Sequence, residues 1–389
     1  MMKTKNIVDA AHNASSIVDL PEDLLVKTLY RFPEACLARL RCTSKGWNVL
    51  IKKDKRLAKS QIIILIGFRV YLASIDLNGV HSDNNVVRLT SQLSLKDPLS
   101  TSPKEVDISE VFHCDGLLLC TTKDDRLVLW NPCSRETRWM NNPVGHSFKK
   151  SNYYALGKSS SSNKYKILRI RQYGNGILEK CLVEYEIYDF TSDSWRIVGE
   201  TSDWSIHWLN HRGISVNRNT YWLASSHIRG SRHIPDSQKD ILLSFDFSTE
   251  RFQSASLPVD DFSYVPMALS VTRQEQRLCL LAMRDVRGLY DTHVWMATKI
   301  ESSGAMSWSK FLTVKQSFYS QFLILCSGMN FLADRENNML LCPCKQQNSN
   351  SFLHIVGKDK HMGVDHHDAG SKCLLVCYVP TLAQIPQGS

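Results

Sequence analysis

The sequence predicts a small all-α unit over residues 17–60 followed by a large all-β unit over residues 61–389. Prolines at helix ends and apolar residues at helical spacing occur before residue 60. After it, short apolar strands alternate with turn-forming polar residues, and an aromatic hairpin recurs at a nearly constant interval. At 389 residues the chain has room for one small and one large domain.

The composition is that of an ordinary globular protein, with 43% hydrophobic and 22% charged residues. No apolar run approaches the roughly 20 residues of a membrane-spanning helix. Residues 1–16 are polar, lack an apolar signal-peptide core and are expected to form a disordered tail. Several of the 12 cysteines lie inside apolar runs, which favours reduced, buried thiols over disulfides. We therefore expect a cytoplasmic or nuclear protein with no membrane partner.

The net charge of +9 does not indicate a nucleic-acid partner. Residues 1–60 hold 12 Lys/Arg against 6 Asp/Glu, whereas the remaining residues hold 35 against 32. A nucleic-acid binder should carry the basic excess on its recognition module. The large module is almost neutral, so no nucleic-acid binding is expected.

The first unit reads as three short helices. Pro21 takes the first position of the first helix, where its missing N–H costs nothing, and Pro33 ends that helix. The second helix is expected over residues 34–42, and Ser44 is the candidate N-cap of the third. Leu25 and Leu29 share one face of the first helix, and apolar residues also occur on another. So small a unit buries little surface, and we expect it to complete its core against a partner or the neighbouring domain.

These residues resemble the F-box pattern in order and spacing, over Leu20-Pro21, Leu24-Leu25, Leu29, Pro33, Leu37, Leu40-Arg41-Cys42, Lys45, Trp47 and Leu50-Ile51. The resemblance implies docking onto a Skp-type adaptor, which brings cullin and a RING subunit. By position, it implies that the adaptor interface includes Ile17, Leu20, Pro21 and Leu24, and that the structural residues are Leu29, Leu40 and Trp47. Thr43 departs from the pattern, because many F-boxes have an apolar residue in this stretch. The alternative is a helical cap on the larger domain.

A hairpin repeat organises the second unit. An apolar strand, a polar turn and an aromatic-bearing strand recur four times, and the closing aromatics are Trp139, Trp195, Phe252 and Trp308. They are separated by 56, 57 and 56 residues. Periods of roughly 50 residues are typical of kelch-type β-propeller blades. We predict a propeller-like domain of six blades, in which the segment after Ile62 helps to close the ring. A pair of β-sandwiches is the alternative.

Residues 100–330 resemble the F-box-associated, type one interaction domain of the plant F-box proteins. The likeness is carried by residues 114–120, 129–132, 215–217, 220–223, 244–247 and 250–252. It implies binding of a target protein without naming it, and hence a substrate receptor of an SCF-type ubiquitin ligase. The alternative function is binding of a carbohydrate or another small ligand, with the F-box serving no ligase.

The sequence shows no catalytic constellation, so we expect a non-enzymatic protein without a cofactor. Gly157-Lys158-Ser159 lacks the upstream glycine of a phosphate loop. The histidine-rich residues 361–368 could join Cys342 and Cys344 around a metal, but a polar loop is the favoured interpretation and no metal is predicted. An inter-blade connection supplies the candidate target-binding residues Trp204, His207, Trp208 and His211, although core packing is the favoured interpretation of them.

Overall fold

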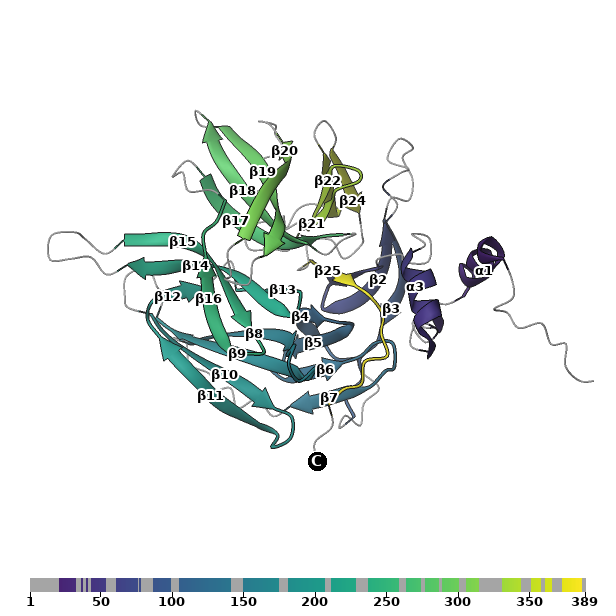
Figure 1. Cartoon of the computed structure of the whole chain (residues 1–389), viewed down its shortest axis with the longest axis horizontal. Coiled ribbons are helices and arrows are strands. Elements are labelled where there is room, and N and C mark those ends of the chain that lie inside the picture. The colour runs from purple at the N-terminus through teal and green to yellow at the C-terminus, as the bar shows by residue number, and fades with distance from the viewer. Residues whose placement is uncertain are drawn as a thin grey trace, which may run out of the picture. The chain divides into compact units, whose positions relative to one another are not determined.

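The chain folds into two compact units, residues 1–59 and residues 60–389, and each is described by itself (Figure 1). The structure is a computed structural model. It describes residues 21–32, 36–37, 40, 43–53, 61–75, 77, 87–98, 105–140, 150–174, 181–206, 211–228, 237–258, 264–273, 277–286, 289–300, 306–314, 331–343, 351–357, 361–365 and 373–386.

Helices α1 (Glu22–Leu29) and α3 (Lys45–Lys53) belong to the first unit. The Pro21 carbonyl accepts the N–H of Leu24 at 2.9 Å, so Pro21 is the N-cap and α1 begins one residue later than predicted. Ser44 Oγ accepts the N–H of Trp47 at 3.1 Å, which confirms Ser44 as the cap of α3. Most of the predicted second helix lies outside the described residues. The buried core of this unit consists of Val26, Leu29, Leu37 and Ile51.

The described part of the second unit contains strands β1 to β25 in five sheets (Figure 1). The first sheet has the order β25-β1-β2-β3, with β1 (Gln61–Ile66), β2 (Arg69–Ile75), β3 (Val87–Leu93) and β25 (Leu374–Tyr378). The second contains, in order, β4 (Ile108–Cys114), β5 (Leu117–Thr122), β6 (Leu127–Trp130) and β7 (Thr137–Met140). The third contains β8 (Lys150–Lys158), β9 (Tyr165–Tyr173), β10 (Leu182–Asp189) and β11 (Ser194–Thr201).

The other two sheets are larger. The fourth contains β12 (Trp204–Ile206), β13 (Ile214–Val216), β14 (Asn219–Ile228), β15 (Ser237–Asp246) and β16 (Arg251–Ala255). The fifth has the order β20-β19-β18-β17-β21-β22-β23-β24, with β17 (Tyr264–Thr272), β18 (Leu278–Val286), β19 (Leu289–Ile300), β20 (Met306–Val314), β21 (Leu332–Asp334), β22 (Met339–Pro343), β23 (Ser351–Gly357) and β24 (His361–Asp365).

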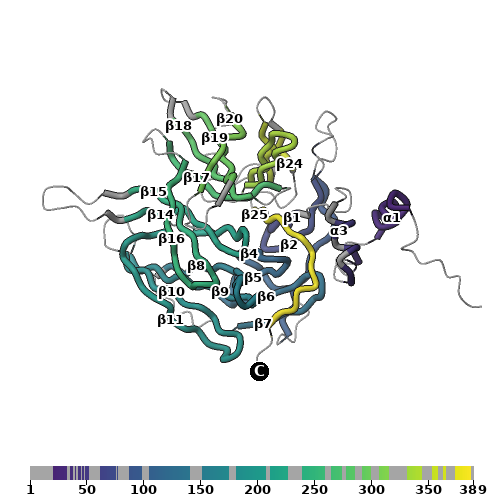
Figure 2. The backbone as a smooth tube through the Cα atoms, viewed as in Figure 1, coloured from purple at the N-terminus to yellow at the C-terminus, as the bar shows by residue number. Residues whose placement is uncertain are grey.

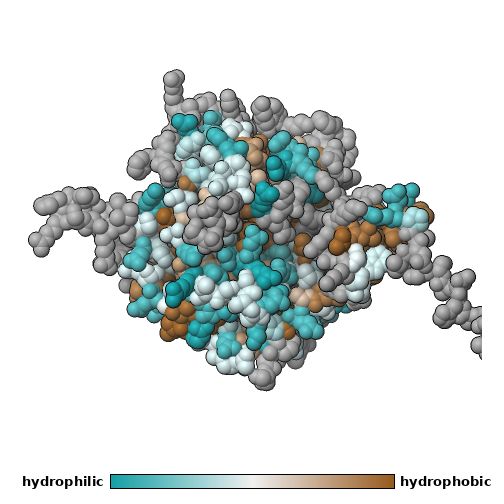
Figure 3. Space-filling model, in the orientation of Figure 1, coloured by the Kyte–Doolittle hydropathy of each residue, from teal (hydrophilic) through white to brown (hydrophobic). Residues whose placement is uncertain are grey.

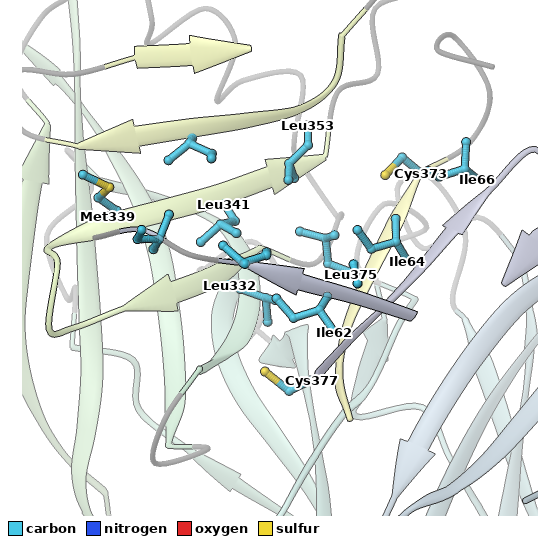
Figure 4. Close-up of a cluster of buried hydrophobic side chains, with 14 residues drawn as sticks. Ile62, Ile64, Ile66, Leu332, Met339, Leu341, Leu353, Cys373, Leu375 and Cys377 are labelled. Atoms are coloured by element: carbon cyan, nitrogen blue, oxygen red, sulfur yellow. The ribbon is translucent and has the colours of Figure 1, made fainter. Parts of the chain in front are cut away.

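Strand β1 closes the propeller by pairing with the last strand, β25, from Gln61 opposite Tyr378 onward. This is the closing role predicted for the segment after Ile62. Alternate residues of a strand face opposite sides of a sheet, so β1 supplies two cores. Ile62 and Ile64 lie in one with Leu341 and Leu375 (Figure 4), whereas the intervening Ile63 lies in another. Burial on both faces explains why this segment is continuously apolar rather than alternating.

The prediction of six blades is wrong as a count of separate sheets. Four sheets have a path of four strands each, whereas β17 to β24 form one continuous sheet of eight. Its two antiparallel halves are joined by a short parallel pairing, with Val271 opposite Leu332 and Thr272 opposite Ala333. Arg273 reinforces the junction, since its guanidinium lies 3.1 Å from Asp334. The repeat period in the sequence gives the spacing of the hairpins along the chain. It carries no information about the pairing of β17 with β21, which joins two sets of strands into one sheet.

The four predicted hairpins are confirmed. The closing aromatics pair across them as Val128–Trp139, Tyr188–Trp195, Phe245–Phe252 and Ala297–Trp308. In the first three, a side-chain oxygen accepts the backbone N–H two residues on, at 2.9 Å for Asn131, 2.8 Å for Asp189 and 2.7 Å for Asp246. The Asn or Asp before each of these turns therefore fixes the hairpin locally.

Residues 379–386, which we call the C-terminal strap, cross one end of the second sheet (Figure 2, yellow). Asn131 Nδ2 donates hydrogen bonds to the carbonyls of Thr381 at 3.2 Å and Ala383 at 2.8 Å. Ile385 is buried in the core that the second and third sheets share. Gly116 has φ +83°, and a Cβ there would lie 2.3 Å from the Thr381 side chain. The strap therefore packs against the second sheet through side-chain hydrogen bonds and a buried apolar contact.

We expect Asn131→Ala to lower the free energy of unfolding by about 1–3 kcal/mol, because it removes a buried turn acceptor and two donors to the strap. Thermal unfolding measures the loss, and limited proteolysis reports release of the strap. The matched control is Asp189→Ala, which removes the equivalent, exposed turn acceptor of the third sheet. Equal effects of the two substitutions would contradict a role of Asn131 in holding the strap.

Candidate functional site

Exposed apolar side chains mark the helical unit. Leu24 is 48% exposed, although Leu25 and Leu29 of the same helix are buried. Tyr30, Phe32 and the α3 residue Val49 are exposed as well. Figure 3 shows brown, apolar surface over these helices. Helix α1 thus has one apolar side for its own core and another that faces solvent, which is the property expected of a docking surface.

The described residues among those predicted for the F-box are either exposed or part of the helical core. Pro21 and Leu24 are exposed, whereas Ile17 and Leu20 lie outside the described residues. Leu29 is 1% exposed and belongs to the core of the unit. Leu40 and Trp47 pack against that core and are partly buried.

Two of the predicted target-binding residues lie in the described part of the fourth sheet, Trp204 in β12 and His211 shortly before β13. Strands β12 and β13 both pair with β14, with Ser205 opposite Ser225 and Ser215 opposite Thr220. His207 and Trp208 lie outside the described residues. Trp204 is only 8% exposed and packs on the Phe252 ring at 4.7 Å. Trp204 therefore belongs to the core, as the favoured interpretation of the sequence has it, and it offers little surface to a target.

His211 and Arg212, which lie just before β13, contact the neighbouring sheets. His211 Nε2 lies 2.9 Å from Glu110 Oε1 of β4, and its ring stacks on Tyr153 of β8. Arg212 Nη2 donates to the Val111 carbonyl. Arg212 is not among the predicted site residues, since nothing local in the sequence distinguishes it from a solvated arginine. The one local hint of a buried position is the adjoining Gly213. A Cβ at this glycine would lie 2.4 Å from the Thr220 side chain, so the chain is closely packed there.

A polar groove of about 300 Å³ is also absent from the sequence-based predictions. Its lining consists of Asp97, Glu105, Val106, Asp107, Lys123, Asp124 and Arg126. The backbone N–H of Lys123 donates to the Asp107 carbonyl at 2.9 Å, which joins the β5–β6 turn to the segment before β4. The residues that line the groove come from two separate stretches of the sequence, so no local motif predicts it.

The charges of the groove are arranged around arginine side chains. Arg126 lies 2.6 Å from Asp97 and 2.7 Å from Asp124, and Arg69 lies 2.7 Å from Asp107. Partial burial opposes ionisation of Asp124, but hydrogen bonds from Thr122 and Arg126 and the Arg126 charge lower its pKa overall. Such a surface fits a polar partner with hydrogen-bonding groups better than an apolar one.

The described residues contain no group of three or more His, Cys, Asp or Glu side chains that could hold a metal ion. Residues 361–365 form β24, and the rest of the histidine-rich stretch and Cys344 lie outside the description. The described cysteines are all free. Burial raises the pKa of Cys114 to about 12, so this thiol stays protonated and is no nucleophile. No described helix is long and apolar enough to cross a membrane.

Comparison with known proteins places both units in one family. Residues 17–59 match the F-box domain, and residues 61–385 match the F-box associated beta propeller domain. The chain belongs to the F-box proteins that carry this propeller. It is 50% identical to "Putative F-box protein At4g10190" of Arabidopsis thaliana, over 95% of this chain and 99% of that one. It is 34% identical to "F-box/kelch-repeat protein At3g16740" of the same plant, over 95% and 99%.

Among solved structures, "Oligogalacturonate lyase in complex with manganese" resembles the chain at 11% identity, with a TM-score of 0.41 over 77% of this chain and 71% of that one. A likeness of this size carries no argument about function.

Proposed function

We propose that this protein is the substrate-recognition subunit of an SCF (Skp–cullin–F-box) ubiquitin ligase. The helical unit docks a Skp-type adaptor, through which cullin and the RING subunit are recruited. The propeller binds a target protein for ubiquitination and proteasomal degradation, in the cytoplasm or the nucleus. The observation that carries the proposal is the solvent-facing apolar side of α1, with Leu24 48% exposed within a segment that matches the F-box.

This function requires no catalytic group in the chain. A receptor that holds its target beside the conjugating enzyme raises the effective concentration of the target's lysines, and so accelerates transfer by proximity. The protein then acts as a non-catalytic adaptor. Its two tasks, docking and recognition, fall to separate compact units.

We expect Leu24→Asp to weaken adaptor binding by about 10- to 100-fold, because a leucine that loses its burial in an interface forfeits about 1.5–3 kcal/mol. Leu24 already faces solvent, so the helical core is left intact. Titration of the full chain with purified Skp-type adaptor measures the change. The control is Val265→Asp, which alters an equally exposed apolar residue of the propeller and should leave binding unchanged. Equal affinity of Leu24→Asp and the wild type would disprove the docking assignment.

The polar groove around Arg126 favours one alternative function, the binding of a carbohydrate or another small polar ligand. In that case the F-box would serve no ligase. A glycan-array screen of the full chain, repeated with Arg126→Met, tests this alternative. Retention of cellular function after deletion of residues 17–57 would favour it over the ligase.

A further inference from the structure

A small cavity lies at the centre of the propeller. Its volume is about 50 Å³, and it is lined by segments of several sheets, with residues 111–113, 212–215, 270–271, 332 and 375–377. These belong to or adjoin β4, β13, β17, β21 and β25. A space of this size holds one or two groups the size of water, because liquid water occupies roughly 30 Å³ per molecule.

One arginine of this lining is buried with part of its hydrogen-bonding capacity unused. Arg212 is 7% exposed. Its Nη2 donates to the Val111 carbonyl, and the guanidinium lies 5.3 Å from the centre of the Phe112 ring. Its Nε and Nη1 have no hydrogen-bond partner among the residues that the structure describes. A buried charged donor without a partner is costly, so such a group indicates a ligand or solvent molecule beside it.

One nearby carboxylate, Glu110, partly offsets this positive charge from outside the cavity. Glu110 attracts Arg212 electrostatically, but its Oε1 lies 2.9 Å from His211 Nε2. Burial lowers the pKa of Arg212 to about 10, which leaves it protonated at neutral pH. Burial also lowers the pKa of His113 to about 4, so this lining residue is neutral and its Nε2 accepts the N–H of Gly116 at 3.0 Å. None of the described lining residues is an Asp or Glu.

We propose that this cavity binds a small free monovalent anion, of the size of chloride or formate, through Nε and Nη1 of Arg212. Such an ion satisfies the unused donors and compensates the buried positive charge. The cavity volume excludes sugars and nucleotides. Because strands from several sheets line the site, the anion ties these sheets together at the propeller axis. This anion site goes beyond the proposed ligase function.

Thermal unfolding of the full chain in chloride, against gluconate at the same ionic strength, tests the proposal. Eight of the nine tryptophans lie after residue 60, so their fluorescence follows the propeller. Above the dissociation constant, each tenfold rise in chloride should raise Tm by about 2–4 °C. Arg212→Met should abolish this dependence. The matched control Arg88→Met, at an exposed arginine of β3, should retain it.

A crystal of the wild type soaked in bromide gives a second readout that does not depend on the folding of any variant. We expect anomalous scattering from bromide within hydrogen-bond distance of Arg212. Equal Tm values in chloride and gluconate, or a water molecule alone at this position, would overturn the proposal. A chloride dependence that persists in Arg212→Met would overturn it as well.

Discussion

Removal of residues 373–389 is expected to prevent the propeller from folding. The deletion removes β25, which pairs with β1 over five residues from Gln61–Tyr378 to Leu65–Leu374. Each of the five side chains of β25 is buried, and a buried apolar side chain contributes about 1.5–3 kcal/mol. The sum is comparable with the entire stability of a typical domain, about 5–15 kcal/mol. Near-UV circular dichroism and limited proteolysis should report loss of fixed tertiary structure.

The control for this deletion is removal of residues 379–389 alone. The shorter deletion takes away the strap but keeps the β1–β25 pairing, so the propeller should fold with a lower Tm. A native-like spectrum for the protein that lacks residues 373–389 would show that the ring does not depend on β25.

Glu186→Leu is expected to lower the free energy of unfolding by about 3–5 kcal/mol, because it leaves a buried arginine without its counter-charge. Arg169 is almost fully buried, and its Nε donates to Glu186 Oε2 at 2.6 Å. Arg171 Nε lies 3.2 Å from the same oxygen. Without the carboxylate, two guanidinium groups would repel each other in the third sheet. Chemical denaturation of the variant and the wild type measures the loss.

The double variant Arg169→Met/Glu186→Leu distinguishes a stability loss caused by the unpaired charge from one caused by lost packing. Replacement of a whole buried ion pair by apolar residues is often neutral, so most of the lost stability should return. The guanidinium of Arg169 also lies 3.9 Å from the centre of the Trp195 ring, and this contact is not recovered. If the double variant were as unstable as Glu186→Leu, the loss would come from packing and not from an unpaired charge.

The features that the sequence predicts correctly are those with local causes. Asp189 and Asp246 predict their hairpins, because each side chain accepts a hydrogen bond from a backbone N–H only two residues away. Ser44 likewise caps α3 within a single turn. The segment after Ile62 is predicted to help close the ring, and its strand β1 does so by pairing with β25.

The features that escape prediction depend on distant contacts. The parallel pairing of Val271 with Leu332 merges two hairpin sets into one sheet, and no period records it. Arg212 meets the carbonyl of Val111, which lies 101 residues away in the sequence. The polar groove also escapes prediction, because its lining comes from two segments that are separate in the sequence. For Trp204 the sequence favours core packing but cannot name the partner, which is the Phe252 ring.

Because β1 pairs with β25, the propeller cannot close until the end of the chain has been synthesised. The ribosome releases Gln61 more than three hundred residues before its partner Tyr378. Until then the apolar strand β1 has an unpaired edge, the kind of surface that aggregates or recruits chaperones. The helical unit, by contrast, is complete early in translation. Nascent chains that stop short of β25 therefore carry a complete helical unit beside a propeller that is not closed, and the unpaired edge of β1 is open to aggregation.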